Sequence, residues 1–164
     1  MFVIESAEDA RAAVGKEIGT SDWITVDQHR IDLFAEATED RQWIHVDVER
    51  SAGGPYGTTI AHGYLTLSLV PDLMRQVFAV QGAAMGVNYG VDTVRFLTPV
   101  PSGSRVRVRV SVRSAEVRED DGLRLGIEAV VELEGAPRPA CVATTIALYR
   151  FAKNDSSPNP EDKA

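Results

Sequence analysis

Apolar residues recur at every second position through much of the chain after Gly82. The clearest run alternates Val106, Val108, Val110 and Val112 with Arg105, Arg107, Arg109 and Ser111. A period of two places these two sets on opposite faces of a strand, one buried and one facing solvent. Similar runs at 91–96, 123–133 and 140–151 are separated by turn residues. Four consecutive strands joined by turns predict an antiparallel sheet.

The segment before these strands, residues 63–80, has a helical pattern instead. Its apolar residues are Leu65, Leu67, Leu69, Val70, Leu73, Met74 and Val77. They cover most of the circumference of a helix, which predicts a buried helix. Pro71 should kink or break it, because proline cannot donate the backbone hydrogen bond. A sheet curled around this helix would cover it on nearly all sides, so we predict an α+β fold.

The N-terminal part predicts two shorter helices and an early strand. Ser6 is a favourable N-cap, with acidic residues in the turn that follows. Residues 21–26 predict a strand, and Thr25 or Asp27 would then cap a helix that ends near Asp40. The apolar side of that helix is expected to consist of Ile31, Leu33, Phe34 and Ala37. Residues 46–59 are rich in glycine and other breakers and predict a loop.

A single domain is expected, since 164 residues can form one adequate core. The periodic patterns end near residue 151. Residues 152–164 are polar and contain two prolines, which predicts a disordered C-terminal tail. We therefore expect one domain over residues 1–151.

Two short segments hold the residues best suited to chemistry. Asp40 and His45 lie five residues apart where a helical pattern breaks, and His62-Gly63 follows at the start of the long helix. A carboxylate and an imidazole can transfer protons, and a helix N-terminus can stabilise charge on a carbonyl oxygen. Spacing alone leaves a structural alternative, in which Asp40 is a helix-end acid and His45 a loop histidine. His29, the third histidine, is expected to be solvated.

Composition excludes several classes of protein. The net charge of −7 argues against a broad basic surface for nucleic acid. The N-terminus lacks the features of a signal peptide, and polar residues interrupt the apolar stretch 61–80, so no membrane span is expected. One cysteine, Cys141, rules out an intramolecular disulfide and a cysteine-rich zinc site, and we expect no metal. This composition favours a reducing cytoplasm.

Four stretches carry a more specific pattern. They are residues 34–45 with Asp40 and His45, residues 59–68 with His62-Gly63, Asn88-Tyr89-Gly90, and residues 94–100. In this order they resemble the MaoC-type dehydratases, the group that contains the (R)-specific enoyl-CoA hydratases, and within it the NodN-like branch. The resemblance extends from about residue 14 to residue 151.

The resemblance implies a hot-dog fold, in which a curved antiparallel sheet wraps around one long helix, and a homodimer. It also implies a hydro-lyase of fatty acid metabolism that reversibly hydrates a trans-2-enoyl thioester to an (R)-3-hydroxyacyl thioester. The acyl carrier would be coenzyme A or acyl carrier protein. Such enzymes use no metal or redox cofactor, and coenzyme A enters only as part of the substrate.

The family motif is commonly Gly-Asp-x-Asn-Pro-(Ile/Leu)-His, and this chain departs from it at three positions. Glu39, Gln42 and Trp43 stand in place of the glycine, asparagine and proline, whereas Asp40 and His45 are retained. A glycine at position 39 would relax the backbone at a helix end.

The resemblance also suggests a role for each site residue. Asp40 and His45 would hold the attacking water; His45 would accept and return protons, and Asp40 would orient the water or share that work. The Gly63 N–H would bind the thioester oxygen, which the absent side chain allows to approach. The remaining expected site residues are Ser68, as a hydrogen-bond partner of Asp40, and Gln42 and Tyr64 at the substrate. His62 is expected to be structural, and the strand arginines to face solvent rather than coenzyme A.

Two alternative functions remain open. A hot-dog acyl-CoA thioesterase would direct its base at the thioester carbon instead of C3, and the ordered Asp40–His45 and His62-Gly63 pattern argues against it. A non-catalytic acyl-binding subunit would be expected to lack Asp40 or His45, and both are present.

Overall fold

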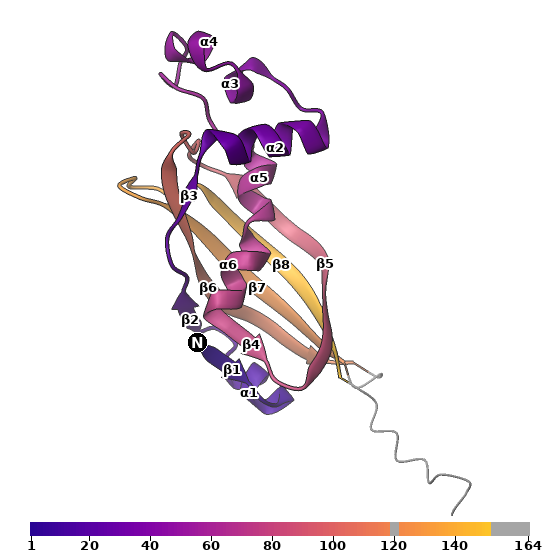
Figure 1. Ribbon diagram of the computed structural model, residues 1–164. Coiled ribbons are helices and arrows are strands. Elements are labelled where there is room, and N and C mark those ends of the chain that lie inside the picture. Colours follow the sequence, from indigo (N-terminus) through magenta and orange to yellow (C-terminus); the bar gives the residue numbers. More distant parts are fainter. Residues whose placement is uncertain (119–121, 152–164) are drawn as a thin grey trace, which may run out of the picture.

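A curved antiparallel sheet wraps around one broken helix, as Figure 1 shows. The computed structural model describes residues 1–118 and 122–151, so the predicted tail, 152–164, lies outside the described residues. No helix in these two ranges is long and apolar enough to cross a membrane. The predicted α+β, hot-dog arrangement is confirmed.

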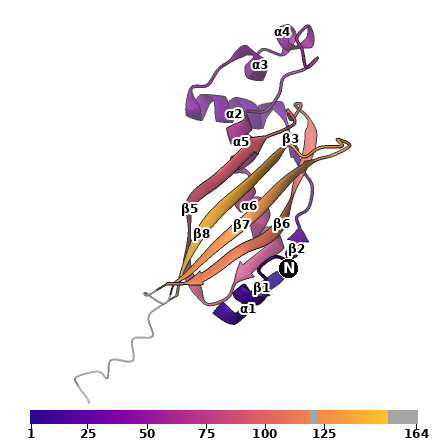
Figure 2. The same ribbon diagram turned by 180° about the vertical axis from the view of Figure 1, so that it is seen from behind.

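The main sheet contains all four strands that the period-two pattern predicts. These are β5 (Ala83–Phe96), β6 (Ser104–Val117), β7 (Leu123–Leu133) and β8 (Cys141–Phe151). Two short N-terminal strands, β2 (Glu17–Thr20) and β3 (Ile24–Val26), both pair with β6, and the order is β2-β6-β7-β8-β5. All pairings in this sheet are antiparallel, as predicted. Seen from behind in Figure 2, the outer face of the sheet is covered by none of the helices formed by the described residues.

A small second sheet is not evident in the sequence. β1 (Phe2–Ile4) and β4 (Phe78–Val80) pair in parallel at the end of the molecule that holds the N-terminus (Figure 1). The helix α1 (Ala7–Ala12) follows β1, and the Ser6 side chain accepts a hydrogen bond from the Asp9 N–H, as expected for its N-cap.

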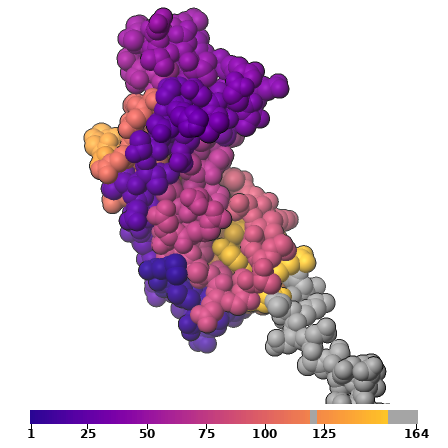
Figure 3. All heavy atoms as spheres, viewed as in Figure 1, coloured from indigo at the N-terminus to yellow at the C-terminus, as the bar shows by residue number. Residues whose placement is uncertain are grey.

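The central helix is broken as Pro71 predicts. It consists of α5 (Gly63–Ser68) and α6 (Val70–Val77), which join at Leu69. One stripe faces the sheet and is buried: Leu65, Val70, Leu73, Met74 and Val77. The opposite side, which includes Tyr64, Ser68, Asp72 and Arg75, is exposed. The prediction that the helix is buried on nearly all sides is therefore wrong for a single chain, because the sheet covers only one side of it. Figure 3 shows the other side at the surface.

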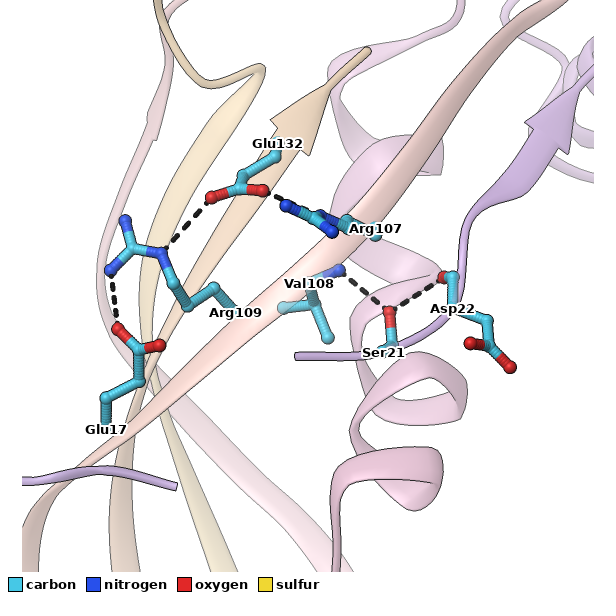
Figure 4. Close-up of polar contacts among 7 residues, drawn as sticks. All are labelled: Glu17, Ser21, Asp22, Arg107, Val108, Arg109 and Glu132. Atoms are coloured by element: carbon cyan, nitrogen blue, oxygen red, sulfur yellow. Dashed lines mark hydrogen bonds and ion pairs between the residues drawn. The ribbon is translucent and has the colours of Figure 1, made fainter. Parts of the chain in front are cut away.

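The arginines of β6 form ion pairs on the outer face of the sheet. Glu132 accepts hydrogen bonds from Arg107 at 2.8 Å and Arg109 at 3.2 Å, and Arg109 also contacts Glu17 at 3.1 Å (Figure 4). Arg105 pairs with Glu134 in the same way. The valines between them are fully buried on the inner face. The predicted alternation is confirmed, and these arginines face away from the helix.

The strand β2 and the start of β3 are joined by a segment that Ser21 fixes to β6. Its hydroxyl accepts from the Val108 N–H and donates to the Asp22 carbonyl, each at 3.0 Å (Figure 4). The predicted strand over 21–26 is thus shorter than expected, since only Ile24–Val26 is extended and paired.

Three helices form a cap over the N-terminal end of α5 (Figure 1). They are α2 (Gln28–Thr38), α3 (Trp43–Val46) and α4 (Val48–Ala52). Asp27 caps α2, as one of the two expected alternatives. The structure corrects two predictions. On the apolar side expected for α2, Leu33 and Ala37 are exposed, while Ala35 is buried. The expected loop 46–59 contains α4, which Asp47 caps.

The helix α2 ends at Glu39 in the left-handed conformation, with φ 61° and ψ 11°. A side chain in this region costs roughly 1–2 kcal/mol, which glycine avoids. We expect Glu39→Gly to raise the free energy of unfolding by about 0.5–1 kcal/mol after the greater flexibility of unfolded glycine is included. The midpoint of urea unfolding measures this change.

Ala37→Gly provides the matched control for Glu39→Gly. Ala37 is exposed and lies inside the same helix, where glycine lowers stability by about 1 kcal/mol. The two variants should therefore shift the midpoint in opposite directions. Equal losses in both would contradict the strain assigned to Glu39.

Candidate active site

Asp40 lies in the turn that connects α2 to α3, and His45 lies on α3. The Asp40 carboxylate accepts a hydrogen bond from the Gln42 N–H at 3.4 Å, which shapes this turn locally. Arg41 bonds Glu36 on α2 at 2.8 Å and is thereby held by α2. Asp40 itself is exposed. The short turn thus places a solvent-accessible carboxylate next to the first turn of α3.

His45 is buried on α3 and its tautomer follows from one contact. Its Nδ1 lies 2.7 Å from the carbonyl oxygen of Ile60. Since a carbonyl only accepts, Nδ1 carries the hydrogen, and Nε2 of the neutral ring is free to accept a proton. Burial lowers the pKa of His45 from its usual value of 6.5, and neighbouring His62 lowers this pKa too. The Ile60 carbonyl and Asp40 raise it, but the pKa is lowered on balance. A neutral imidazole at physiological pH is suited to act as a base.

The segment 59–62 holds His45 and the start of α5 in register. The Ile60 N–H donates to Ile44 at 3.0 Å, and the Ala61 N–H donates to Val100 at 2.8 Å. Gln28 on α2 adds a bond of 2.8 Å to the His45 carbonyl. These bonds fix the cap helices to the loop that follows β5.

His62 stacks on His45 and reaches the main chain of Asp40. The two ring centroids lie 3.7 Å apart at an interplanar angle of 24°. The His62 Nε2 lies 2.9 Å from the Asp40 carbonyl oxygen. One side-chain atom from each of Asp40, His45 and His62 lies within 4.8 Å of the other two. Stacked imidazoles direct their lone pairs side by side rather than at one point, so this trio is better arranged for proton transfer than for chelating a metal.

Gly63 begins α5 beside this cluster. The first N–H groups of a helix have no partner within it, and among the described residues no hydrogen bond is formed by the Gly63 N–H. A Cβ at this position would lie 2.8 Å from the ring of Phe96. The position therefore needs glycine because Phe96 packs directly against its α-carbon.

A pocket of about 370 Å³ opens at this point. His45, Gly63, Thr66 and Phe96 are among the residues that line it. Asp40 is not among the residues that line the pocket. Its carboxylate is exposed and has an oxygen within 4.8 Å of a ring nitrogen of His45. A base, an unpaired backbone N–H and an open cavity are thus brought together.

The other expected site residues are placed differently. The Ser68 hydroxyl is exposed and donates to the Tyr64 carbonyl at 2.7 Å, one turn back in its own helix, so the structure corrects the expected bond from Ser68 to Asp40. Tyr64 is 68% exposed and packs edge-on against Phe96. Gln42 is exposed and caps α3 through its backbone alone.

Two residues of the site were not anticipated from the sequence. Thr66 lies three residues after Gly63, on the same face of α5, and is 4% exposed. Phe96 packs against Gly63 from the end of β5. Helical spacing alone could have identified Thr66, whereas the approach of Phe96 depends on the curvature of the sheet.

The fold and the site define a hot-dog protein with a carboxylate–imidazole pair at the N-terminal end of its central helix. Residues 9–132 match the model of the MaoC like domain. The chain belongs to this family.

Relatives and solved structures agree with this assignment. The 3-hydroxyacyl-thioester dehydratase Z of Mycobacterium tuberculosis H37Rv is 48% identical, over 91% of this chain and 99% of that protein. Nodulation protein N of Rhizobium leguminosarum bv. viciae is 46% identical, over 92% and 94% of the two chains, which confirms the NodN-like resemblance. The (R)-hydratase of A. caviae has the same fold, with a TM-score of 0.66 at 21% identity over 84% of this chain and 97% of that one.

Proposed function

We propose that this protein is a 3-hydroxyacyl-thioester dehydratase. In the reverse direction, the same reaction is that of an (R)-specific enoyl-CoA hydratase. The observation that supports the proposal is that His45 and Gly63 line one pocket, and that a carboxylate oxygen of Asp40 lies within 4.8 Å of a ring nitrogen of His45. The 48% identity to a protein named as such a dehydratase supports the same activity.

Hydration needs a nucleophilic water, a proton for C2 and a site for negative charge. Water held between His45 and Asp40 attacks C3, and its proton passes to His45 Nε2 as the O–H bond breaks. The electrons of the C2=C3 bond move towards the thioester oxygen, where the Gly63 N–H stabilises the developing charge. The protonated His45 then gives this proton to C2, the thioester carbonyl re-forms, and His45 returns to its neutral state. No step requires a metal or redox cofactor, and coenzyme A enters as part of the substrate.

A groove beyond the pocket offers space for the acyl chain. Two further hollows, of about 180 and 310 Å³, follow one another between the central helix and β5. Pro71, Met74 and Asn88 line both of them. Figure 3 shows atoms of β8 in the gap between the helix and β5. We propose that the acyl chain extends from Gly63 along this groove, with the carrier (coenzyme A or acyl carrier protein) outside.

An assay with crotonyl-CoA separates the proposed reaction from its alternatives. Hydration removes the enoyl absorbance without releasing thiol, whereas a thioesterase releases thiol. Enoyl-CoA substrates of increasing chain length then report how much of the groove is used. Saturable binding of acyl-CoA without turnover at any chain length would favour a non-catalytic subunit.

We also propose a homodimer, formed through the edge strand β5. This strand has 14 residues, and among the described residues it pairs only with β8. Its exposed apolar side chains include Met85, Val87, Tyr89 and Val91. A long apolar edge with unpaired backbone groups is suited to pairing with a second copy. A cytoplasmic location, expected from the single buried cysteine, remains part of the proposal.

Charge on this edge should dissociate the dimer. We expect the wild-type protein to have about twice its chain mass of 17.8 kDa, and Val87→Lys/Tyr89→Lys to have the mass of one chain, because lysine at an edge opposes strand pairing. Light scattering after gel filtration measures both. Val14→Lys is the control, since Val14 is also exposed but lies near β6, away from β5. A monomeric wild-type protein, or dissociation by the control alone, would contradict pairing through β5.

A further inference from the structure

His62 is a buried titratable side chain that none of the hydration steps uses. It is 3% exposed, between Phe34 on α2 and His45 on α3, whose ring centroids are 5.0 and 3.7 Å from its own. An apolar ring would fill this space without the cost of burying polar nitrogens. The presence of an imidazole therefore needs an explanation in terms of its hydrogen bonds.

The two nitrogens of His62 have different surroundings. Nε2 faces the Asp40 carbonyl oxygen at 2.9 Å and must carry the hydrogen that it donates. Nδ1 is buried and has no hydrogen-bond partner among the described residues. The bond to Asp40 therefore selects the tautomer with its hydrogen on Nε2.

We propose that His62 is a positioning residue for both members of the Asp40–His45 pair, through its bond to the Asp40 carbonyl and its stack on the His45 ring. The inference rests on the proposed hydratase function. Its bond to Asp40 spans 22 residues, whereas the bonds within the turn, from the Arg41 N–H to the Glu39 carbonyl and from the Gln42 N–H to the Asp40 carboxylate, are local. His62 therefore ties the turn that carries the carboxylate to the start of α5, next to Gly63.

The stack with His45 also affects the protonation of that ring. Two charged imidazoles at 3.7 Å would repel each other, and neighbouring His62 lowers the pKa of His45. The charged group that faces the two stacked rings is the Asp40 carboxylate, from the α2–α3 turn. The other elements packed around these rings contribute uncharged groups: Phe34 and Gln28 from α2, and Thr66 from α5.

Two substitutions separate the hydrogen bond from the ring. His62→Phe keeps a ring against His45 and Phe34 but loses the donor, whereas His62→Gln places an amide N–H near the position of Nε2. We expect His62→Phe to lower kcat about 10–100-fold with KM little changed, because a small displacement of Asp40 misplaces the water. His62→Gln should recover most of that loss. In both, the acidic limb of the rate profile should move to higher pH, since His62 lowers the pKa of His45.

The result that overturns the proposal is a His62→Phe enzyme with wild-type kcat and an unmoved acidic limb. Losses that only follow the fraction of folded protein, equal in both variants, would also overturn it. Nitrogen NMR of the histidines in the wild-type protein tests the same idea without turnover or substitution. His62 should carry its hydrogen on Nε2, as its bond to the Asp40 carbonyl requires. A hydrogen on Nδ1 instead would overturn this inference alone, whereas a wild-type protein without hydratase turnover would contradict the proposed function.

Discussion

Asp40→Asn is expected to lower hydratase turnover by about 10²–10⁴-fold, the usual loss when a general acid or base is removed. The change keeps the size of the side chain and an oxygen that can still accept from the Gln42 N–H. Because Asp40 is exposed, its loss should leave the free energy of unfolding nearly unchanged. Steady-state rates on crotonyl-CoA, together with urea unfolding, measure the two effects separately.

The pH profile adds a second test of the same substitution. In the hydration direction His45 must begin neutral, so the wild-type rate should fall only below pH 6.5, because burial lowers the pKa of this ring. The Asp40 carboxylate acts in the opposite sense and raises the pKa of His45. Its removal should therefore shift the acidic limb to still lower pH, opposite to the shift expected for the His62 variants.

Asp47→Asn is the matched control for Asp40→Asn. Asp47 is an exposed aspartate in the same cap and accepts from the Arg50 N–H at the start of α4. Asp47→Asn should change stability little, because asparagine caps a helix about as well as aspartate, and it should leave turnover near that of the wild type. An Asp40→Asn enzyme that retains near-normal turnover would remove Asp40 from the proposed mechanism.

The strands were predictable because each has a strong pattern of its own. The valines of β6 alternate with arginines over a long run, and only one strand register buries all of them. The short elements could not be predicted in this way. α3 and α4 have four and five residues, too few for an intrinsic preference to show, and β1 pairs with β4 across more than 70 residues of sequence. Their stability depends on tertiary contacts.

The candidate site shows the same division between local and tertiary information. The sequence places Asp40 and His45 close together through a short connection. The sequence does not predict the position of Ser68 correctly. Ser68 follows Gly63 by five residues and therefore lies on a different face of α5 from the pocket. Thr66 follows Gly63 by three residues and lines the pocket. The stack of His62 on His45 requires α3 and α5 to meet, and no local pattern predicts that contact. Of the residues of α5 that carry a hydroxyl, Thr66 is therefore the one that lines the pocket.

Gly63→Ala is expected to lower turnover by about 10²–10³-fold, the loss typical of a removed oxyanion donor. A Cβ at position 63 would lie 2.8 Å from two atoms of the Phe96 ring, so either Phe96 or the start of α5 must move. The added methyl group also occupies space beside the N–H that the thioester oxygen approaches. The rate on crotonyl-CoA measures the combined loss, and the thermal midpoint shows whether the fold tolerates the shift.

Phe96→Leu in the same chain distinguishes these two causes. The smaller side chain gives the new methyl group room, so the double variant Gly63→Ala/Phe96→Leu should regain stability relative to Gly63→Ala. If the N–H of residue 63 binds the thioester oxygen, turnover should remain low in the double variant, because the methyl group still obstructs the approach. Phe96→Leu alone measures what the loss of the ring costs. Full recovery of turnover in the double variant would show that only the packing of Phe96 requires glycine, and it would contradict the role of the Gly63 N–H.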